Sequence, residues 1–102
     1  MSEKITEHFK NDRQYRYEFY KKIGIGQVVD EFEMDRHHPN GIEIHKITDN
    51  AFIKIYNKRT GKLITMLCAT PGQIKRYYPK GQVPRDILNK AIEHTRLGYN
   101  IV

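Results

Sequence analysis

Two short segments near the middle of the chain carry side chains that can perform acid–base and phosphate chemistry. Glu43 and His45 lie two residues apart in the run GIEIHKIT, and Lys54 follows in the run AFIKIYN. An imidazole donates or accepts a proton near neutral pH, and a lysine ammonium holds a phosphate. Metal-independent cleavage of RNA needs both, because the ribose 2′-hydroxyl loses a proton while the phosphoryl group gains negative charge. We therefore take His45 and Lys54 as candidate catalytic residues.

A second group of candidates follows the last apolar run. It reads Lys75-Arg76-Tyr77-Tyr78, so a guanidinium that can bind a phosphate stands beside two phenols. Tyrosines stack on unpaired bases, donate hydrogen bonds and transfer protons. A solvent-facing strand or a packed edge would carry the same residue types, so their placement decides between the interpretations. The candidate catalytic residues are His45, Lys54, Thr65, Arg76 and Tyr78, and the candidate substrate-binding residues are Glu43, Tyr56, Lys75 and Tyr77.

The faces of the predicted strands decide whether these residues can meet. Side chains alternate along a strand. In GIEIHKIT the isoleucines at positions 42 and 44 therefore point to one face, and Glu43 and His45 point to the other. In the same way, the isoleucines at positions 53 and 55 point to the face opposite Lys54. If all four isoleucines face the core, His45 and Lys54 share the open face on strands about 4.8 Å apart. Both faces of the run KLITMLCA are apolar, so the side to which Thr65 points stays open. The predicted core face consists of Ile42, Ile44, Ile53 and Ile55.

Four strand-like runs between two helices would position these residues. A helix is expected over residues 4–22, ended by the glycines of Gly24-Ile25-Gly26, and another from Pro84 to a cap at Gly98. Pro39-Asn40-Gly41 and Asp49-Asn50 are expected to be tight turns, and the last three strands to form a meander. We predict an α+β fold: an N-terminal helix, a four-stranded antiparallel sheet and a C-terminal helix. The expected strands are 27–34, 41–48, 51–57 and 62–69.

Length and composition set the class of protein. A chain of 102 residues is expected to form a single domain over residues 1–102: a helical segment 1–23, the sheet 27–69, and a turn and helix over 70–102. Eighteen Lys and Arg against twelve Asp and Glu give a formal net charge of +6, which favours an anionic partner such as RNA. Cys68 is the single cysteine, so a disulfide within the chain is excluded, and it is expected to be a buried, inert thiol. We expect no cofactor, metal, membrane span or signal peptide, and a cytoplasmic location.

The stretch from His38 to Tyr78 resembles a broad group of bacterial toxin-type nuclease domains. The resemblance rests on the runs PNGIEIH, IKIYN, TGK and PGQIKRYY. The group unites the barnase, EndoU, colicin and RelE ribonucleases, and it is characterised more by layout than by fixed residues. It implies helical structure packed on a four-stranded antiparallel sheet that cleaves RNA without a metal. It further implies His45 and Lys54 as the catalytic basic pair, Thr65 as a hydrogen-bonding residue for the substrate, and late contributions from Arg76 and Tyr77 or Tyr78.

The resemblance also implies partners and alternatives. Such domains are delivered into the cytoplasm of a target cell or are encoded beside an acidic antitoxin or immunity protein. The leading hypothesis is a metal-independent endoribonuclease for single-stranded RNA. The alternative is a non-catalytic basic module, as in a phage or mobile-element protein, that binds nucleic acid or an acidic protein. The third hypothesis is a purely structural interaction domain.

Overall fold

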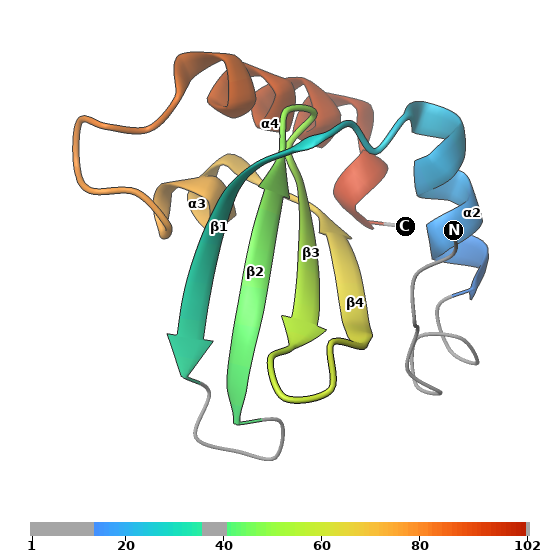
Figure 1. Ribbon diagram of the computed structural model, residues 1–102. Coiled ribbons are helices and arrows are strands. Elements are labelled where there is room, and N and C mark those ends of the chain that lie inside the picture. The colour runs from blue at the N-terminus through green and yellow to red at the C-terminus, as the bar shows by residue number, and fades with distance from the viewer. Residues whose placement is uncertain (1–13, 36–40, 102) are drawn as a thin grey trace.

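The computed structural model describes residues 14–35 and 41–101 (Figure 1). The predicted α+β fold is confirmed: one helix precedes four strands, and a short and a long helix follow them. Residues 4–13 of the predicted first helix, and Pro39-Asn40 of the first predicted turn, lie outside the described residues. The elements are α2 (Gln14–Ile23), β1 (Val28–Asp35), β2 (Ile42–Thr48), β3 (Phe52–Asn57), β4 (Leu63–Cys68), α3 (Pro71–Lys75), α4 (Arg85–Leu97) and the 3-10 helix η1 (Tyr99–Ile101).

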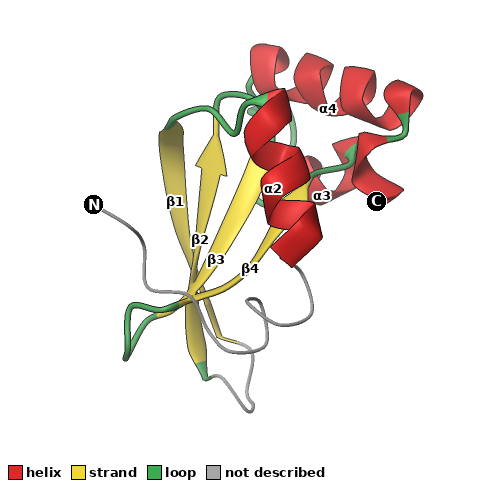
Figure 2. Ribbon diagram, turned by 90° about the vertical axis from the view of Figure 1, so that its right-hand side faces the viewer, coloured by secondary structure: helices red, strands yellow, loops and turns green. Residues whose placement is uncertain are grey.

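The four strands form one antiparallel sheet in the order β1-β2-β3-β4, so the predicted meander extends to all of them. In Figure 1 the short helix α3 lies behind the sheet, and α4 runs across the upper end of the strands; α2 stands beside β4 in both ribbon views (Figures 1 and 2). We call the side that packs against α3 and α4 the helix face. The opposite side is the outer face, and α2 packs on its β4 end. No described element crosses the outer face over β1 and β2.

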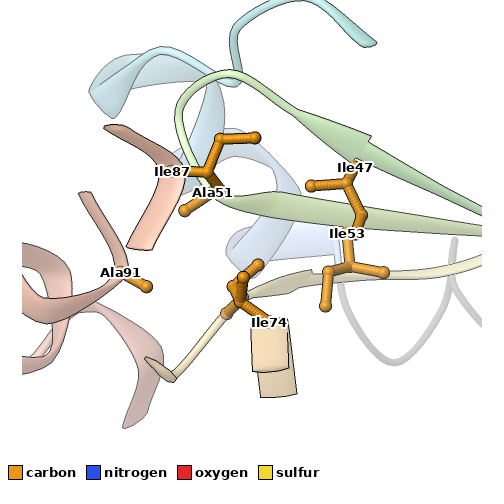
Figure 3. Close-up of a cluster of buried hydrophobic side chains, with 7 residues drawn as sticks. Ile47, Ala51, Ile53, Ile74, Ile87 and Ala91 are labelled. Carbon is orange, nitrogen blue, oxygen red and sulfur yellow. The ribbon is translucent and has the colours of Figure 1, made fainter. Parts of the chain in front are cut away.

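The helix face carries the first of two buried clusters. Ile47 from β2 and Ile53 from β3 are cross-strand partners, and both have at most 1% of their surface exposed. They meet Ile74 of α3 and Ile87 of α4, as Figure 3 shows. Since a fully buried isoleucine stabilises a fold by about 1.5–3 kcal/mol, this cluster fixes both helices against the sheet. Its buried members are Ile47, Ala51, Ile53, Ala69, Ile74, Ile87 and Ala91.

The second cluster lies on the outer face, beneath α2. Tyr20 of α2 is 2% exposed, and its ring packs edge-on against Phe52 with the centroids 5.0 Å apart. Tyr99 of η1 packs against the same cluster, whereas Ile101 is 86% exposed. The buried members are Tyr20, Phe52, Leu63, Met66 and Cys68. The buried residues of β4 all belong to this cluster, whereas Leu67 on the opposite face is partly buried and packs against the first cluster. A register shift between Ile55 and Tyr56 brings Leu63 to the same side as Met66 and Cys68.

The two helices after the sheet begin and end at residues that are typical of helix caps. The Thr70 hydroxyl caps α3 by accepting a hydrogen bond from the Gln73 amide at 3.2 Å, and the Gln73 side-chain oxygen accepts one from the Thr70 amide at 2.9 Å. Pro84 is the N-cap of α4. Gly98 ends that helix with φ 76°, a left-handed conformation that glycine adopts without steric cost. The helix predicted from Pro84 to Gly98 is thus confirmed.

The pairing of β2 with β3 contradicts the predicted core face. His45 pairs with Ile55, and Lys46 pairs with Lys54, so His45 and Lys54 lie on opposite faces of the sheet. The grouping within each strand was correct, but the two groups of isoleucines do not share a side. Ile53 and Ile55 point to the helix face, whereas Ile44 points away from it and Ile42 is 40% exposed.

The β2–β3 loop is the physical cause of this difference. A two-residue turn at Asp49-Asn50 would place Thr48 opposite Ala51 and, by counting back along both strands, His45 opposite Lys54. Instead Ala51 adopts φ 62° and joins the loop, with its amide donating to the Thr48 carbonyl at 3.1 Å. The loop has three residues, so the pairing of β2 with β3 shifts by one residue. Each side chain of β3 therefore shares a face with the other set of β2 side chains.

Candidate functional site

The helix face holds a buried polar residue pair on β2, close to the first cluster. Glu43 is 6% exposed and His45 is 3% exposed. Because they are two residues apart on one strand, both side chains point the same way, and the imidazole Nε2 lies 2.9 Å from Glu43 Oε1. A buried carboxylate and imidazole are costly to desolvate unless they bind each other. The pair is therefore a specific polar feature of an otherwise apolar face.

Tyr77 reaches the same imidazole from a distant part of the sequence. Its hydroxyl lies 2.6 Å from His45 Nδ1, across a separation of 32 residues. The helix α3 ends at Lys75, and the turn after it directs Tyr77 back over the sheet, where its ring packs against Phe32 at 5.4 Å. Glu43, His45 and Tyr77 thus form a continuous chain, which we call the relay.

The hydrogen bonds of the relay suggest how a proton can move along it. A neutral imidazole that donates its Nε2 hydrogen to Glu43 presents an accepting Nδ1 to the phenol of Tyr77. With both ring nitrogens engaged and little surface exposed, His45 has no free nitrogen for a substrate. Tyr77 is partly buried, so it is the most exposed of the three relay residues.

Two predicted residues lie on the other side of the sheet. Lys54 and Tyr56 point to the outer face, where the ammonium of Lys46 lies 4.9 Å from the centre of the Tyr56 ring. The predicted His45 and Lys54 pair is therefore wrong as a converging pair, for the register reason given above. Any reaction at the relay has to proceed without the Lys54 ammonium.

Three other predicted residues lie on or near the helix face. Thr65 pairs with Ile55, which in turn pairs with His45, so all three point to the same side two strands apart. Arg76 forms the C-cap of α3 and is exposed, next in sequence to Tyr77. Lys75 is also exposed, at the last position of α3. Arg76 is thus related to the relay only as the residue that precedes Tyr77 in the sequence.

Tyr78 has a different environment from its neighbour. Its hydroxyl donates a hydrogen bond to the carboxylate of Asp30 on β1, and its ring packs edge-on against Phe32 at 5.2 Å. Burial, followed by this bond to Asp30, raises the pKa of the Tyr78 phenol well above its usual range. Tyr78 is therefore held neutral, and its hydroxyl ties the end of α3 to the first strand.

A second buried histidine contacts two members of the other cluster, Phe52 and Cys68. His94 of α4 is 4% exposed, and its Nδ1 lies 3.3 Å from the sulfur of Cys68. Burial lowers the pKa of His94, with the Glu93 carboxylate opposing part of that effect, and burial raises the pKa of the Cys68 thiol to about 12. Cys68 is buried as predicted, and it stays a thiol rather than a reactive thiolate at neutral pH.

Sequence reasoning did not identify Asp30 and Lys46 as members of these networks. Asp30 is one of several acids in β1, and nothing local distinguishes it from the others. Lys46 directly follows His45 on β2, so its side chain points to the opposite face, where it lies beside Tyr56 and Lys54. The sequence does not indicate these two neighbours. The missing information was the register between strands.

Within residues 14–35 and 41–101, no three His, Cys, Asp or Glu side chains converge in a way that could hold a metal ion. Over the same residues, no helix has the length and apolar character needed to cross a bilayer.

Comparison of the chain with family models, with curated proteins and with solved structures finds no match. The toxin-type nuclease group therefore stays a resemblance in sequence layout.

Proposed function

We propose that the protein is a toxin-like endoribonuclease that cleaves single-stranded RNA without a metal. The observation that carries the proposal is the relay, in which His45 lies 2.9 Å from Glu43 and 2.6 Å from Tyr77. A buried carboxylate that orients an imidazole, which in turn accepts a proton from a hydroxyl, is an arrangement suited to general base catalysis. The net charge of +6 supports an RNA substrate.

In the proposed reaction Tyr77 is the catalytic residue, and His45 and Glu43 are positioning residues. The phenol oxygen takes the proton of the ribose 2′-hydroxyl while its own proton passes to His45 Nδ1, and Glu43 stabilises the resulting imidazolium. The 2′-oxygen then attacks phosphorus, the bond to the 5′-oxygen breaks, and that oxygen takes a proton from water. The products are a 2′,3′-cyclic phosphate and a free 5′-hydroxyl. Arg76 stands next to Tyr77 and supplies positive charge for the phosphoryl oxygens.

Two neighbouring tyrosines provide a matched test. Tyr77→Phe removes the hydroxyl of the relay, and Tyr78→Phe removes the same group one residue later, where it binds Asp30. We expect Tyr77→Phe to slow cleavage of a labelled single-stranded RNA in EDTA by about 10²-fold or more, the size typical of one acid or base. Tyr78→Phe should change the rate by less than about tenfold, and melting temperatures should show that both variants are folded.

The outcomes separate the candidate functions. If Tyr77→Phe cuts as fast as Tyr78→Phe, the relay has no catalytic role. If the wild-type protein binds RNA but leaves it intact in EDTA, the non-catalytic alternative applies. Mass spectrometry of the cleaved ends checks the chemistry, because a 3′-phosphate formed without a cyclic intermediate contradicts attack by the 2′-oxygen.

The toxin character is tested in growing cells. Induced expression of the wild-type chain should slow bacterial growth, and expression of Tyr77→Phe at an equal level should not. Equal growth of both cultures would contradict a toxic ribonuclease. An acidic neutralising partner is expected only if growth slows.

A further inference from the structure

The segment that joins α3 to α4 is basic and contains no acid. From residue 50 to residue 85 the sequence has no Asp or Glu, and the last four cations of this stretch lie between the end of α3 and the start of α4. We call residues 75–85 the basic loop, which extends outward beyond the β1 edge of the sheet in Figure 1. All four cations are exposed, and none of them forms an ion pair with another described residue. They are Lys75, Arg76, Lys80 and Arg85.

Three side chains anchor the basic loop to the protein. Tyr77, Tyr78 and Val83 are partly buried and pack against the first cluster. Between these anchors, residues 79–82 form a tight turn that is closed by a backbone hydrogen bond of 2.9 Å, and Gly81 has φ 83°. The apolar members of the loop therefore give it a defined shape, while its cations stay in contact with solvent.

Two hollows border this loop. One, of about 390 Å³, is lined by Lys75, Tyr78, Lys80, Gly81 and Val83. The other, of about 360 Å³, is lined by Gly81, Val83, Arg85, Leu88 and Asn89. Both volumes lie within the range of roughly 300–1,000 Å³ that is usual for small-ligand pockets. Each hollow combines apolar or aromatic side chains, on which an unpaired base can stack, with a cation that can hold a phosphate.

Two acids lie beside the basic loop, but neither pairs with its cations. The Asp30 carboxylate accepts the hydrogen bond of the Tyr78 hydroxyl. Asp86 follows Arg85 in the sequence and lines a different hollow, together with Lys90 of α4. Among the described residues, neither hollow of the basic loop is lined by a carboxylate. A phosphate that binds there has no protein anion to displace.

We propose that the basic loop binds single-stranded RNA, with phosphates at Lys75, Lys80 and Arg85 and unpaired bases in the two hollows. The inference rests on the proposed function for the identity of the polymer, and it adds where the strand lies. The two hollows share Gly81 and Val83, so successive nucleotides can occupy them in turn from the end of α3 to the start of α4.

The proposed path leads directly to the relay. Tyr77 belongs to the basic loop and to the relay, and the rings of Tyr77 and Tyr78 both pack on Phe32, with centroids 5.4 Å and 5.2 Å from it. Tyr78 also lines the first hollow. A nucleotide in that hollow is therefore separated by a single aromatic ring from Tyr77, where the proposed reaction takes place.

Binding is measured by fluorescence anisotropy with a labelled single-stranded RNA of about 12 nucleotides, in the Tyr77→Phe background to slow cleavage. We expect Lys75→Gln, Lys80→Gln and Arg85→Gln each to weaken binding about two- to fivefold and to lower the slope of log Kd against log salt by about 0.7. Lys62→Gln is the matched control, because Lys62 is exposed and precedes β4, whereas the basic loop follows it. It should change Kd and the salt slope by less than any of the three.

Each outcome either supports or overturns the inference. Equal Kd values for the three loop variants and Lys62→Gln, all with unchanged melting temperatures, would show that net charge alone drives binding, and the inference would fail. Equal affinity for an RNA duplex, for a strand without bases or for an acidic peptide of the same charge would also overturn it. A wild-type protein that binds through the basic loop but cuts nothing would remove the proposed function alone. Cleavage by a protein whose loop variants bind RNA like the wild type would remove only the inference.

Discussion

The two faces of the sheet use the same strands for opposite purposes. On the helix face, Ile47 and Ile53 are almost completely buried, and the polar residues Glu43 and His45 bind each other within the protein. On the outer face over β1 and β2, Ile42 is 40% exposed and the charged pairs are open to solvent. His45 and Lys54 have similar local patterns but different surroundings, because His45 is enclosed on the helix face and Lys54 lies on the outer face.

The largest expected effect tests which face is the core. Ile53→Ala should lower the free energy of unfolding by about 2–5 kcal/mol, because it leaves a cavity beneath α3 and α4. Ile42→Ala, the same kind of change on the outer face, should cost less than about 1 kcal/mol. Urea denaturation of both variants measures the difference. Equal losses would mean that the β2–β3 register described above is wrong.

That register marks the limit of what the sequence could predict. The four strands, the helix from Pro84 to Gly98 and the alternation along β2 follow from local patterns, and all are present in the fold. The face shared by β2 and β3 depends instead on whether Ala51 belongs to the loop. Alanine rarely adopts a positive φ, so Asp49-Asn50 reads as a two-residue turn.

The candidate site was predictable only in its parts. Glu43, His45 and Tyr77 were each identified as candidates, but their mutual contact links residues 32 positions apart and requires α3 to turn the chain back. No periodicity within β2 or α3 carries that information, because a tertiary contact is fixed by how the elements pack. The same holds for the bond between Tyr78 and Asp30, which distinguishes two adjacent tyrosines that the sequence presents as equivalent.

A second prediction compares a buried carboxylate with an exposed one. Glu43→Leu should lower the free energy of unfolding by about 1–3 kcal/mol, since His45 loses a partner in an enclosed site. Glu33→Leu removes the exposed carboxylate that binds Lys58 and should cost less than about 1 kcal/mol. Thermal unfolding at pH 7 measures both. A loss as large for Glu33→Leu as for Glu43→Leu would remove the distinction between the two faces.

The pH dependence of stability sharpens the comparison at the α2 end of the outer face. Burial lowers the pKa of His94 in the folded protein below its ordinary value of 6.5, so the unfolded chain binds the proton more tightly. The stabilising effect of a neutral His94 is complete above pH 6.5 and is lost as the pH falls below it. The melting temperature of the wild-type protein should therefore drop between pH 7.5 and pH 5 by more than that of His94→Leu. Parallel curves for the two proteins would show that His94 does not contribute to the pH dependence.

The smallest effect concerns the opposed lysines, and its sign is the informative part. Lys54→Gln removes a charge directly opposite Lys46 while it keeps a long polar side chain. Relief of the repulsion should raise the free energy of unfolding by about 0.2–1 kcal/mol at low salt. The gain should shrink in 0.5 M salt, because ions screen exposed charges, whereas Lys90→Gln should show neither the gain nor its salt dependence. A loss of stability in Lys54→Gln at low salt would mean that repulsion between the Lys46 and Lys54 ammonium groups does not destabilise the sheet.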